Sequence, residues 1–225
     1  MSTSLYLAAA ILLFASHAIP SWPGVRPALI AQFGRPGFIA AHSVLSLVAL
    51  TLFVLAYREA DMAGHVFHPA DSAAKLAVVL MPVALFLMVA RVTTSFGEPN
   101  APNAPVGIYR ITRFPGSMGL LLWALLHLQA TGDTRRFILF ATMAAIALFA
   151  MVKNDWVLRH AGTRDAATFR ARTSAVPFAA ILAGRQRLVW HEIGALRVLG
   201  ALAAYAAILH AHSLLFGVDP LYWLS

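Results

Sequence analysis

The stretch GIYRITRFPGSMGLLLWALLHLQATGD (107–133) determines how the rest of the chain is interpreted. It starts with the basic residues Arg110 and Arg113, passes a Pro-Gly pair and continues as a long apolar run. His127 lies within that run, four residues after Trp123, and positions four apart share one face of a helix. An ionisable side chain at such a depth in a membrane-spanning helix indicates a functional site.

The overall composition favours an integral membrane protein. Of the 225 residues, 60% are hydrophobic and 12% are charged, and the mean hydropathy is +0.74. Soluble domains carry about 25% charged residues. We therefore expect an all-α fold, with one domain over 1–225 that forms a polytopic bundle of about six transmembrane helices. The chain has no cysteine, which excludes disulfides, thiolate metal ligands and a cysteine nucleophile.

Apolar runs long enough to cross the hydrocarbon layer, which takes roughly 20 residues, predict six spans. These spans are 4–19, 37–57, 72–94, 116–131, 136–152 and 193–216. Three of them are near the short limit, so their ends are expected to extend or tilt. Gly132 and Asp133 predict a tight turn that makes the fourth and fifth spans an antiparallel hairpin.

The cations indicate the orientation of the spans. The formal net charge is +8, and lysines and arginines gather in the connections 20–36, 95–115 and above all 153–192. Such connections face the cytoplasm, which places both termini on the periplasmic side of a bacterial inner membrane. The residues before the first apolar run carry no Lys or Arg, so we expect a retained helix rather than a cleaved signal peptide. Membrane lipid is the expected partner of the cations, and nucleic acid is not, because no nucleic-acid-reading module accompanies them.

Histidines are the main candidates for metal ligands inside the bundle. Those within or near the predicted spans are His17, His42, His127, His210 and His212. Two imidazoles on different helices commonly hold a haem, whereas a structural zinc requires four closed ligands. The alternative is that these side chains only form hydrogen bonds between helices. Counting residues from the span ends predicts an inner pair, His17 and His42, and an outer group that contains the other three.

Arginines at the span ends have two interpretations. Arg110 and Arg113 at the start of the fourth span, and Arg26 after the first, are suited to contact a phospholipid or a haem propionate. The favoured interpretation is that they are simply the cations that normally flank cytoplasmic helix ends. Trp123 is suited to pack on a cofactor, although an aromatic side chain on a buried helix face more often fills the helix interface.

Three motifs carry a family resemblance: FASHAIPSWPGVRPALIAQFG (14–34), the central stretch 107–133 and HSLLFGVDPL (212–221). With them the chain resembles the NnrU membrane proteins, to which the 15-cis-zeta-carotene isomerases of plants and cyanobacteria are related. The resemblance implies a membrane haem b protein whose iron is held by His17 and His127. A shared iron for these two has to bridge the membrane midplane, and it tolerates a helix offset of roughly 10 Å.

The sequence departs from the family pattern at two positions. Phe114 stands where the family usually has the histidine of an R-H-P motif. Ala124 stands where the isomerases carry a cysteine, three residues before the histidine of the LW-x-x-x-H motif. The second departure affects isomerase chemistry more than haem binding.

Three functions follow from these observations as hypotheses. The first is an NnrU-type haem b protein linked to nitrite and nitric-oxide metabolism, as a denitrification accessory, sensor or electron carrier. The second is a haem-dependent cis-trans isomerase of a carotenoid-like polyene, and the third is a haem-free membrane scaffold. The expected small ligands are accordingly a hydrophobic polyene or a nitrogen oxide, and whether the chain is an enzyme stays open.

Overall fold

The computed structural model describes residues 3–60, 64–95 and 104–224. The described residues form helices and no strand. The six longest helices are α1 (Thr3–Ser21), α2 (Arg26–Glu59), α3 (Asp71–Thr93), α5 (Pro115–Thr131), α6 (Thr134–His160) and α10 (Ala195–Phe216). Shorter ones are α4 (Ile108–Ile111), α7 (Arg164–Arg172), α8 (Ala179–Leu182), α9 (Trp190–Ile193) and the 3-10 helix η1 (Pro220–Leu224). The expected all-α fold is confirmed.

Five of the described helices, namely α1, α2, α3, α6 and α10, are long and apolar enough to cross a membrane. Helix α5 has 17 residues, which makes it about 25 Å long and slightly shorter than the hydrocarbon layer. It is nevertheless central, because it packs against both α3 and α6. The chain is therefore a multi-pass membrane protein, and α5 is at the short limit that was expected for the fourth span.

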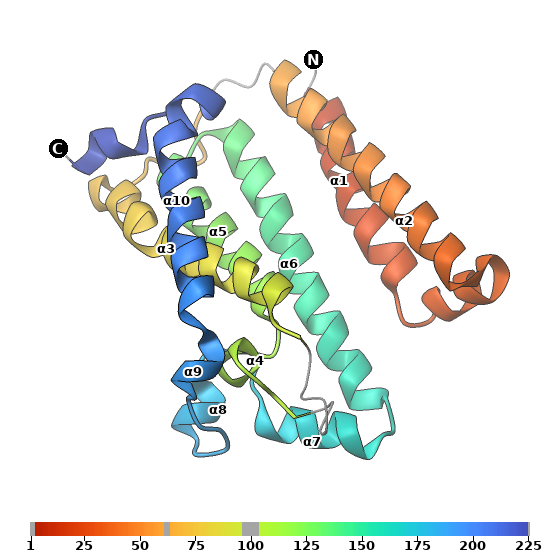
Figure 1. Ribbon diagram of the computed structural model, residues 1–225. Helices are drawn as coiled ribbons and strands as arrows, with labels where there is room; N and C mark the ends of the chain where they lie inside the picture. The colour runs from red at the N-terminus through yellow and green to blue at the C-terminus, as the bar shows by residue number, and fades with distance from the viewer. Residues whose placement is uncertain (1–2, 61–63, 96–103, 225) are drawn as a thin grey trace.

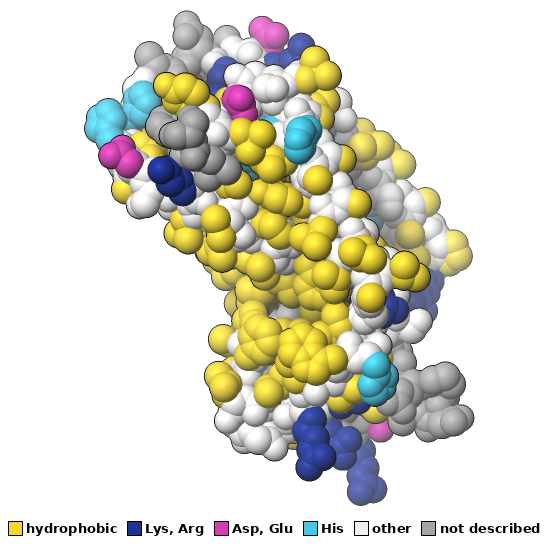
Figure 2. All heavy atoms as spheres, turned by 60° about the vertical axis from the view of Figure 1, so that its left-hand side comes forward, with side chains coloured by type: hydrophobic (Ala, Val, Ile, Leu, Met, Phe, Trp, Pro, Cys, Tyr) yellow, Lys and Arg dark blue, Asp and Glu magenta, His cyan; other side chains and the backbone are white. Residues whose placement is uncertain are grey.

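The helices run alternately up and down between two ends of the bundle (Figure 1). We call the end where both chain termini lie the terminal end. The opposite end, which holds α4, α7, α8, α9 and the α1–α2 turn, is called the basic end (Figure 1). Figure 2 shows a broad apolar belt between these ends, with Lys and Arg side chains gathered at one end and charges of both signs at the other. A belt of this kind is what a lipid-embedded surface requires.

Helix α6 lies between two parts of the bundle. On one side α1 packs against α2 as a hairpin, and α1 also packs against α6. On the other side α5 packs against α6 and α3, and α3 packs against α10 (Figure 1). The hairpin core contains the buried side chains of Tyr6, Leu13 and Phe53, onto which α6 adds Met143 among others. The α6 helix is thus the main contact between the hairpin and the other long helices.

Local sequence features set the helix ends. Helix α5 starts at Pro115, where the missing N–H costs nothing. The predicted turn is present: Gly132 adopts φ 68°, and the Asp133 carboxylate accepts a hydrogen bond from the Arg136 amide at 3.0 Å. Asp133 therefore caps the first turn of α6.

Helices α3 and α5 approach closely at Gly119. A Cβ atom on this residue would lie 2.7 Å from the Ala84 carbonyl oxygen and 2.8 Å from Met88 Cγ. Only a residue without a side chain fits there, as is common where membrane helices pack tightly. This contact holds α5 in the middle of the bundle.

Two helices are longer than the predicted spans. Helix α2 begins at Arg26 because a short helical segment precedes the span and joins it across a kink at Gly34, where φ is 70° and ψ 163°. Helix α6 continues to His160, so the first part of the predicted connection 153–192 belongs to it. The first part of α2 and the last part of α6 both carry cations and lie at the basic end. The predicted spans were shorter because they stopped at these polar side chains.

Candidate functional site

His127 is the candidate iron ligand that lies most clearly inside the bundle. Its Nδ1 donates to the Trp123 carbonyl oxygen at 2.9 Å, because a carbonyl oxygen only accepts. The hydrogen bond leaves Nε2 as the atom that is able to bind a metal. The imidazole stacks on Phe140 of α6, with centroids 4.6 Å apart, and its centroid lies 4.8 Å from that of the Trp123 ring. The predicted contact between Trp123 and His127 is confirmed.

The other members of the outer histidine group differ in their surroundings. His212 lies close enough to His127 for their charges to interact. Its Nδ1 donates to the Val218 carbonyl oxygen at 2.8 Å. His210 is exposed and bonds only within its own helix, to the Ala206 carbonyl oxygen at 2.8 Å. The outer group is therefore an inward His127, a nearby His212 and an outward His210.

The inner pair predicted from residue counts is present. The rings of His17 on α1 and His42 on α2 have centroids 6.3 Å apart. His17 Nδ1 donates to the Leu13 carbonyl oxygen at 2.9 Å, whereas His42 Nε2 donates to the Ser16 carbonyl oxygen at 3.2 Å. The free nitrogens are thus Nε2 of His17 and Nδ1 of His42. Because α1 and α2 pack directly on each other, this pair has no space between its helices for a porphyrin.

Helix α6 contacts the surroundings of both His17 and His127. Phe140 stacks on His127, while Phe149 contacts Phe14 and Trp22, which flank His17 in the sequence. The helix rises about 13 to 14 Å between these two phenylalanines. Two imidazoles on one iron place their nitrogens only about 4 Å apart.

The contacts on α6 lie at different levels for the two histidines, and a haem shared by His17 and His127 would have to span this difference. A haem held by His127 fits the donor chemistry, because its Nε2 is free and its ring is fixed. The tethering bond alone does not identify a ligand, because exposed His160 and His210 make the same bond to the carbonyl four residues earlier. The described residues contain no group of three or more His, Asp or Glu side chains that could hold a metal ion.

The arginines of the central stretch are paired with carboxylates of the protein. Arg110 binds Glu192 through Nε and Nη2, each at 2.7 Å, and Gln186 through Nη1 at 2.7 Å. Arg113 is buried and binds Asp155, while Arg26 lies over the Phe38 ring at 5.7 Å. A haem propionate at Arg110 or Arg113 would have to displace a carboxylate that is already in place.

Arg113 connects three segments of the basic end. Besides the Asp155 carboxylate on α6, its guanidinium binds the Thr173 hydroxyl at 2.9 Å, the Thr173 carbonyl at 2.8 Å and the Arg170 carbonyl at 3.0 Å. Asp155 also pairs with Arg159. Asp155 thus pairs with arginines that follow the fifth predicted span as well as with Arg113, and the sequence did not reveal this role of Arg113.

Glu192 is the other acidic group that organises this end. Hydrogen bonds from the Arg110 side chain and from the Gly107 amide, the latter at 2.6 Å, hold the pKa of its carboxyl below the usual value. Burial raises the pKa of the hydroxyl of Tyr109, which precedes Arg110 in the sequence. These contacts join α4 to α9 and so attach the start of α10 to the central stretch.

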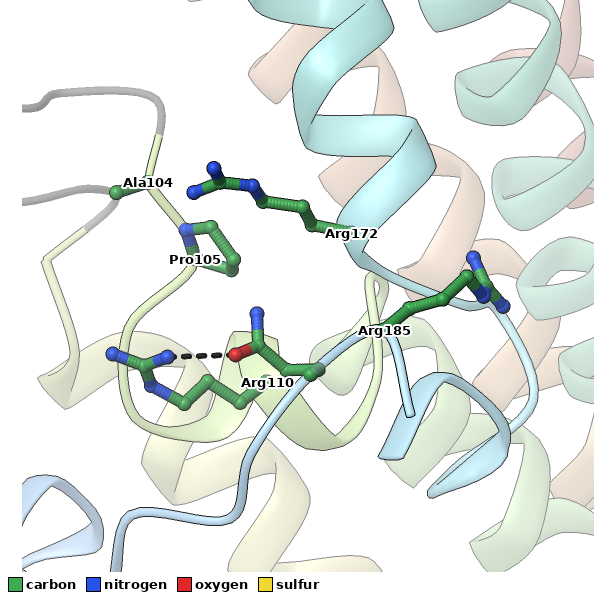
Figure 3. Close-up of a pocket in the computed structure, with 6 residues that line it drawn as sticks. Ala104, Pro105, Arg110, Arg172 and Arg185 are labelled. Carbon is green, nitrogen blue, oxygen red and sulfur yellow. Dashed lines mark hydrogen bonds between the residues drawn. The ribbon is translucent and has the colours of Figure 1, made fainter. Parts of the chain in front are cut away.

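A cavity of about 470 Å³ opens beside Arg110 at the basic end. It is lined by Ala104, Pro105, Arg110, Arg172, Arg185 and Gln186. Figure 3 shows Arg110 bonded to the Gln186 side-chain oxygen, Arg172 reaching over Pro105, and Arg185 turned away. The sequence did not predict this cavity, because the residues that line it are up to 82 positions apart.

Comparisons with known proteins find relatives of the chain by sequence. A sequence model described as NnrU protein matches residues 5–220. The chloroplastic 15-cis-zeta-carotene isomerase of Arabidopsis thaliana is 34% identical over 130 residues, which cover 56% of this chain and 35% of that protein. The chloroplastic enzyme of the same name from Zea mays is 34% identical over 91 residues, 40% of this chain and 25% of that protein. The matches thus span about a third or less of these relatives' length, and no solved structure matches the chain.

Proposed function

The chain belongs to the NnrU family, and on this basis we propose that it is an integral membrane haem b protein with His127 as iron ligand. We further propose that it isomerises a conjugated polyene. The observation that carries the proposal is the His127 imidazole, which is fixed through Nδ1 and packs against Trp123 of α5 and Phe140 of α6. The reaction is inferred from the isomerases that share 34% identity with the chain.

The residues around His127 would have defined tasks. The Trp123 carbonyl fixes the tautomer and makes Nε2 the ligating atom. Stacking on Phe140 restricts the rotation of the imidazole ring. A bound haem would supply an iron able to interact with the conjugated chain of a polyene. The apolar side chains of the bundle would bind a polyene through buried area alone.

We place the basic end in the cytoplasm and the termini in the periplasm. The arginines of α7 and of the segment that follows it gather at the basic end, namely Arg164, Arg170, Arg172, Arg185 and Arg187. Such an excess of cations marks the cytoplasmic side of bacterial membrane proteins.

Visible absorption of the purified protein, expressed with ample haem supply, tests the ligand. Wild type is expected to show a Soret band, and His127→Ala to lose it. His160→Ala is the matched control, because it removes an exposed imidazole with the same backbone bond. His17→Ala is expected to keep the band. A His127→Ala protein that binds haem as wild type does would refute the assignment.

The reaction is tested with haem-loaded protein and a poly-cis carotenoid, followed by chromatography. We expect a product with one double bond changed from cis to trans, absent with His127→Ala. An unchanged carotenoid together with a Soret shift on adding nitric oxide would instead support the nitrogen-oxide role that the family resemblance implies.

A further inference from the structure

An apolar hollow lies where the α1–α2 turn meets α6. Its volume is about 320 Å³, and the side chains that line it are Ala18, Ile19, Trp22, Val25 and Phe149. The Trp22 and Phe149 rings stack across it with centroids 6.1 Å apart. The hollow thus offers an apolar surface between the hairpin and α6, separate from the His127 site.

Two cations without a carboxylate partner lie beside this hollow. Arg26 follows Val25 at the start of α2, and Lys153 lies one helical turn beyond Phe149 on α6. Their charges interact with each other and with His42. Among the described residues, neither Arg26 nor Lys153 forms an ion pair, in contrast to Arg110 and Arg113. Neighbouring cations that lack counter-charges attract an anion.

The depth of the hollow matches a lipid headgroup boundary. Trp22 is 54% exposed and Ile19 60% exposed, so both face the surroundings of the bundle. Tryptophan is enriched where the hydrocarbon layer meets the headgroups. The kink at Gly34 separates the segment that begins with Arg26 from the apolar span of α2. An amphiphile at this position would contact the apolar side chains of the hollow with its chain and the cations nearer the basic end with its headgroup.

We propose that this hollow binds one anionic phospholipid of the leaflet at the basic end. The phosphate lies between Arg26 and Lys153, and an acyl chain covers the hollow against Trp22 and Phe149. Charge complementarity selects an anionic headgroup, and the apolar lining selects a chain-bearing molecule over a free anion. The bound lipid closes the junction between hairpin and α6.

Competition between phosphatidylglycerol and phosphatidylcholine, measured by native mass spectrometry of the full chain, tests the headgroup. Wild type is expected to retain one phosphatidylglycerol preferentially. The double variant Arg26→Gln/Lys153→Gln is expected to lower that preference about 25-fold, roughly fivefold for each cation. The control Arg58→Gln/Lys75→Gln removes the same charge at the terminal end and should leave the preference unchanged. Equal preference in both double variants would overturn the proposal.

Quenching of tryptophan fluorescence by brominated phosphatidylglycerol tests the position of the acyl chain. We expect a saturable quenching component that Trp22→Phe removes and Arg26→Gln/Lys153→Gln weakens. The His127→Ala protein should retain it, so a failure of the haem assignment leaves this result intact. The proposal is wrong if Arg26→Gln/Lys153→Gln loses haem while its lipid preference and quenching stay as in wild type, because the cations would then serve the haem carboxylates.

Discussion

Replacing Asp155 by asparagine should strongly destabilise the basic end. The Asp155 side chain is 15% exposed and that of Arg113 is 8% exposed. Asparagine keeps the shape but removes the charge, so the guanidinium of Arg113 remains buried without a counter-ion. Its other bonds, to Thr173 and to the Arg170 carbonyl, keep it from turning out to solvent.

Breaking a buried ion pair from one side costs about 3 to 5 kcal/mol. We take about 3 kcal/mol, since Asp155 retains some exposure, which shifts the unfolding equilibrium roughly 150-fold. The matched control is Arg159→Gln. It removes an arginine from the same carboxylate, but the Arg159 side chain is 59% exposed. An exposed pair of this kind contributes about 0.5 kcal/mol or less.

The assay is reversible unfolding in mixed micelles by titration with a denaturing detergent, followed through Trp156, which neighbours Asp155 in the sequence. The free energy of unfolding of Asp155→Asn should fall well below that of wild type, and that of Arg159→Gln should stay close to it. Equal and small losses in the two variants would refute the reasoning that the buried charge of Arg113 depends on Asp155.

Two further predictions concern packing and pH. Gly119→Ala should lower the free energy of unfolding by about 1 to 3 kcal/mol, because the new methyl group meets the Ala84 carbonyl oxygen at 2.7 Å. In the same assay Gly200→Ala, with no atom within 4 Å, should raise it by about 0.5 to 1 kcal/mol; a loss there as large as at Gly119 would contradict the packing argument. Because its folded pKa is lowered, Glu192 contributes stability that is present above its ordinary pKa of 4.5 and is lost as the pH falls through the folded value. Acid titration of the emission of the neighbouring Trp190 should therefore show a transition below pH 4.5 that Glu192→Gln lacks, and an identical transition in that variant would exclude Glu192 as its source.

The sequence predicted the membrane bundle well because hydropathy is a local property. Each apolar run became a helix, and Gly132 with Asp133 predicted the turn between α5 and α6. Counting residues from the span ends also predicted that His17 and His42 share one depth. These predictions need only the length of a helix and the thickness of the hydrocarbon layer.

The candidate site was harder to predict because it depends on which helices are neighbours. The partners Arg113 and Asp155 lie 42 positions apart, so no local pattern joins them. Likewise the sequence gives no sign that α6 would pack against both α1, which carries His17, and α5, which carries His127. The family resemblance points to both histidines but says nothing about the distance between them in space. That distance depends on how the helices pack.

The central place of α6 has a consequence for how changes spread through the protein. Phe140 and Phe149 both belong to it, one beside His127 and the other beside the apolar hollow. A rotation or axial slide of this one helix would reposition both aromatic rings at once, whereas a shift of α2 or α10 would disturb one side alone. A lipid in the hollow and a ligand at His127 would therefore both contact this one helix, which is about 40 Å long.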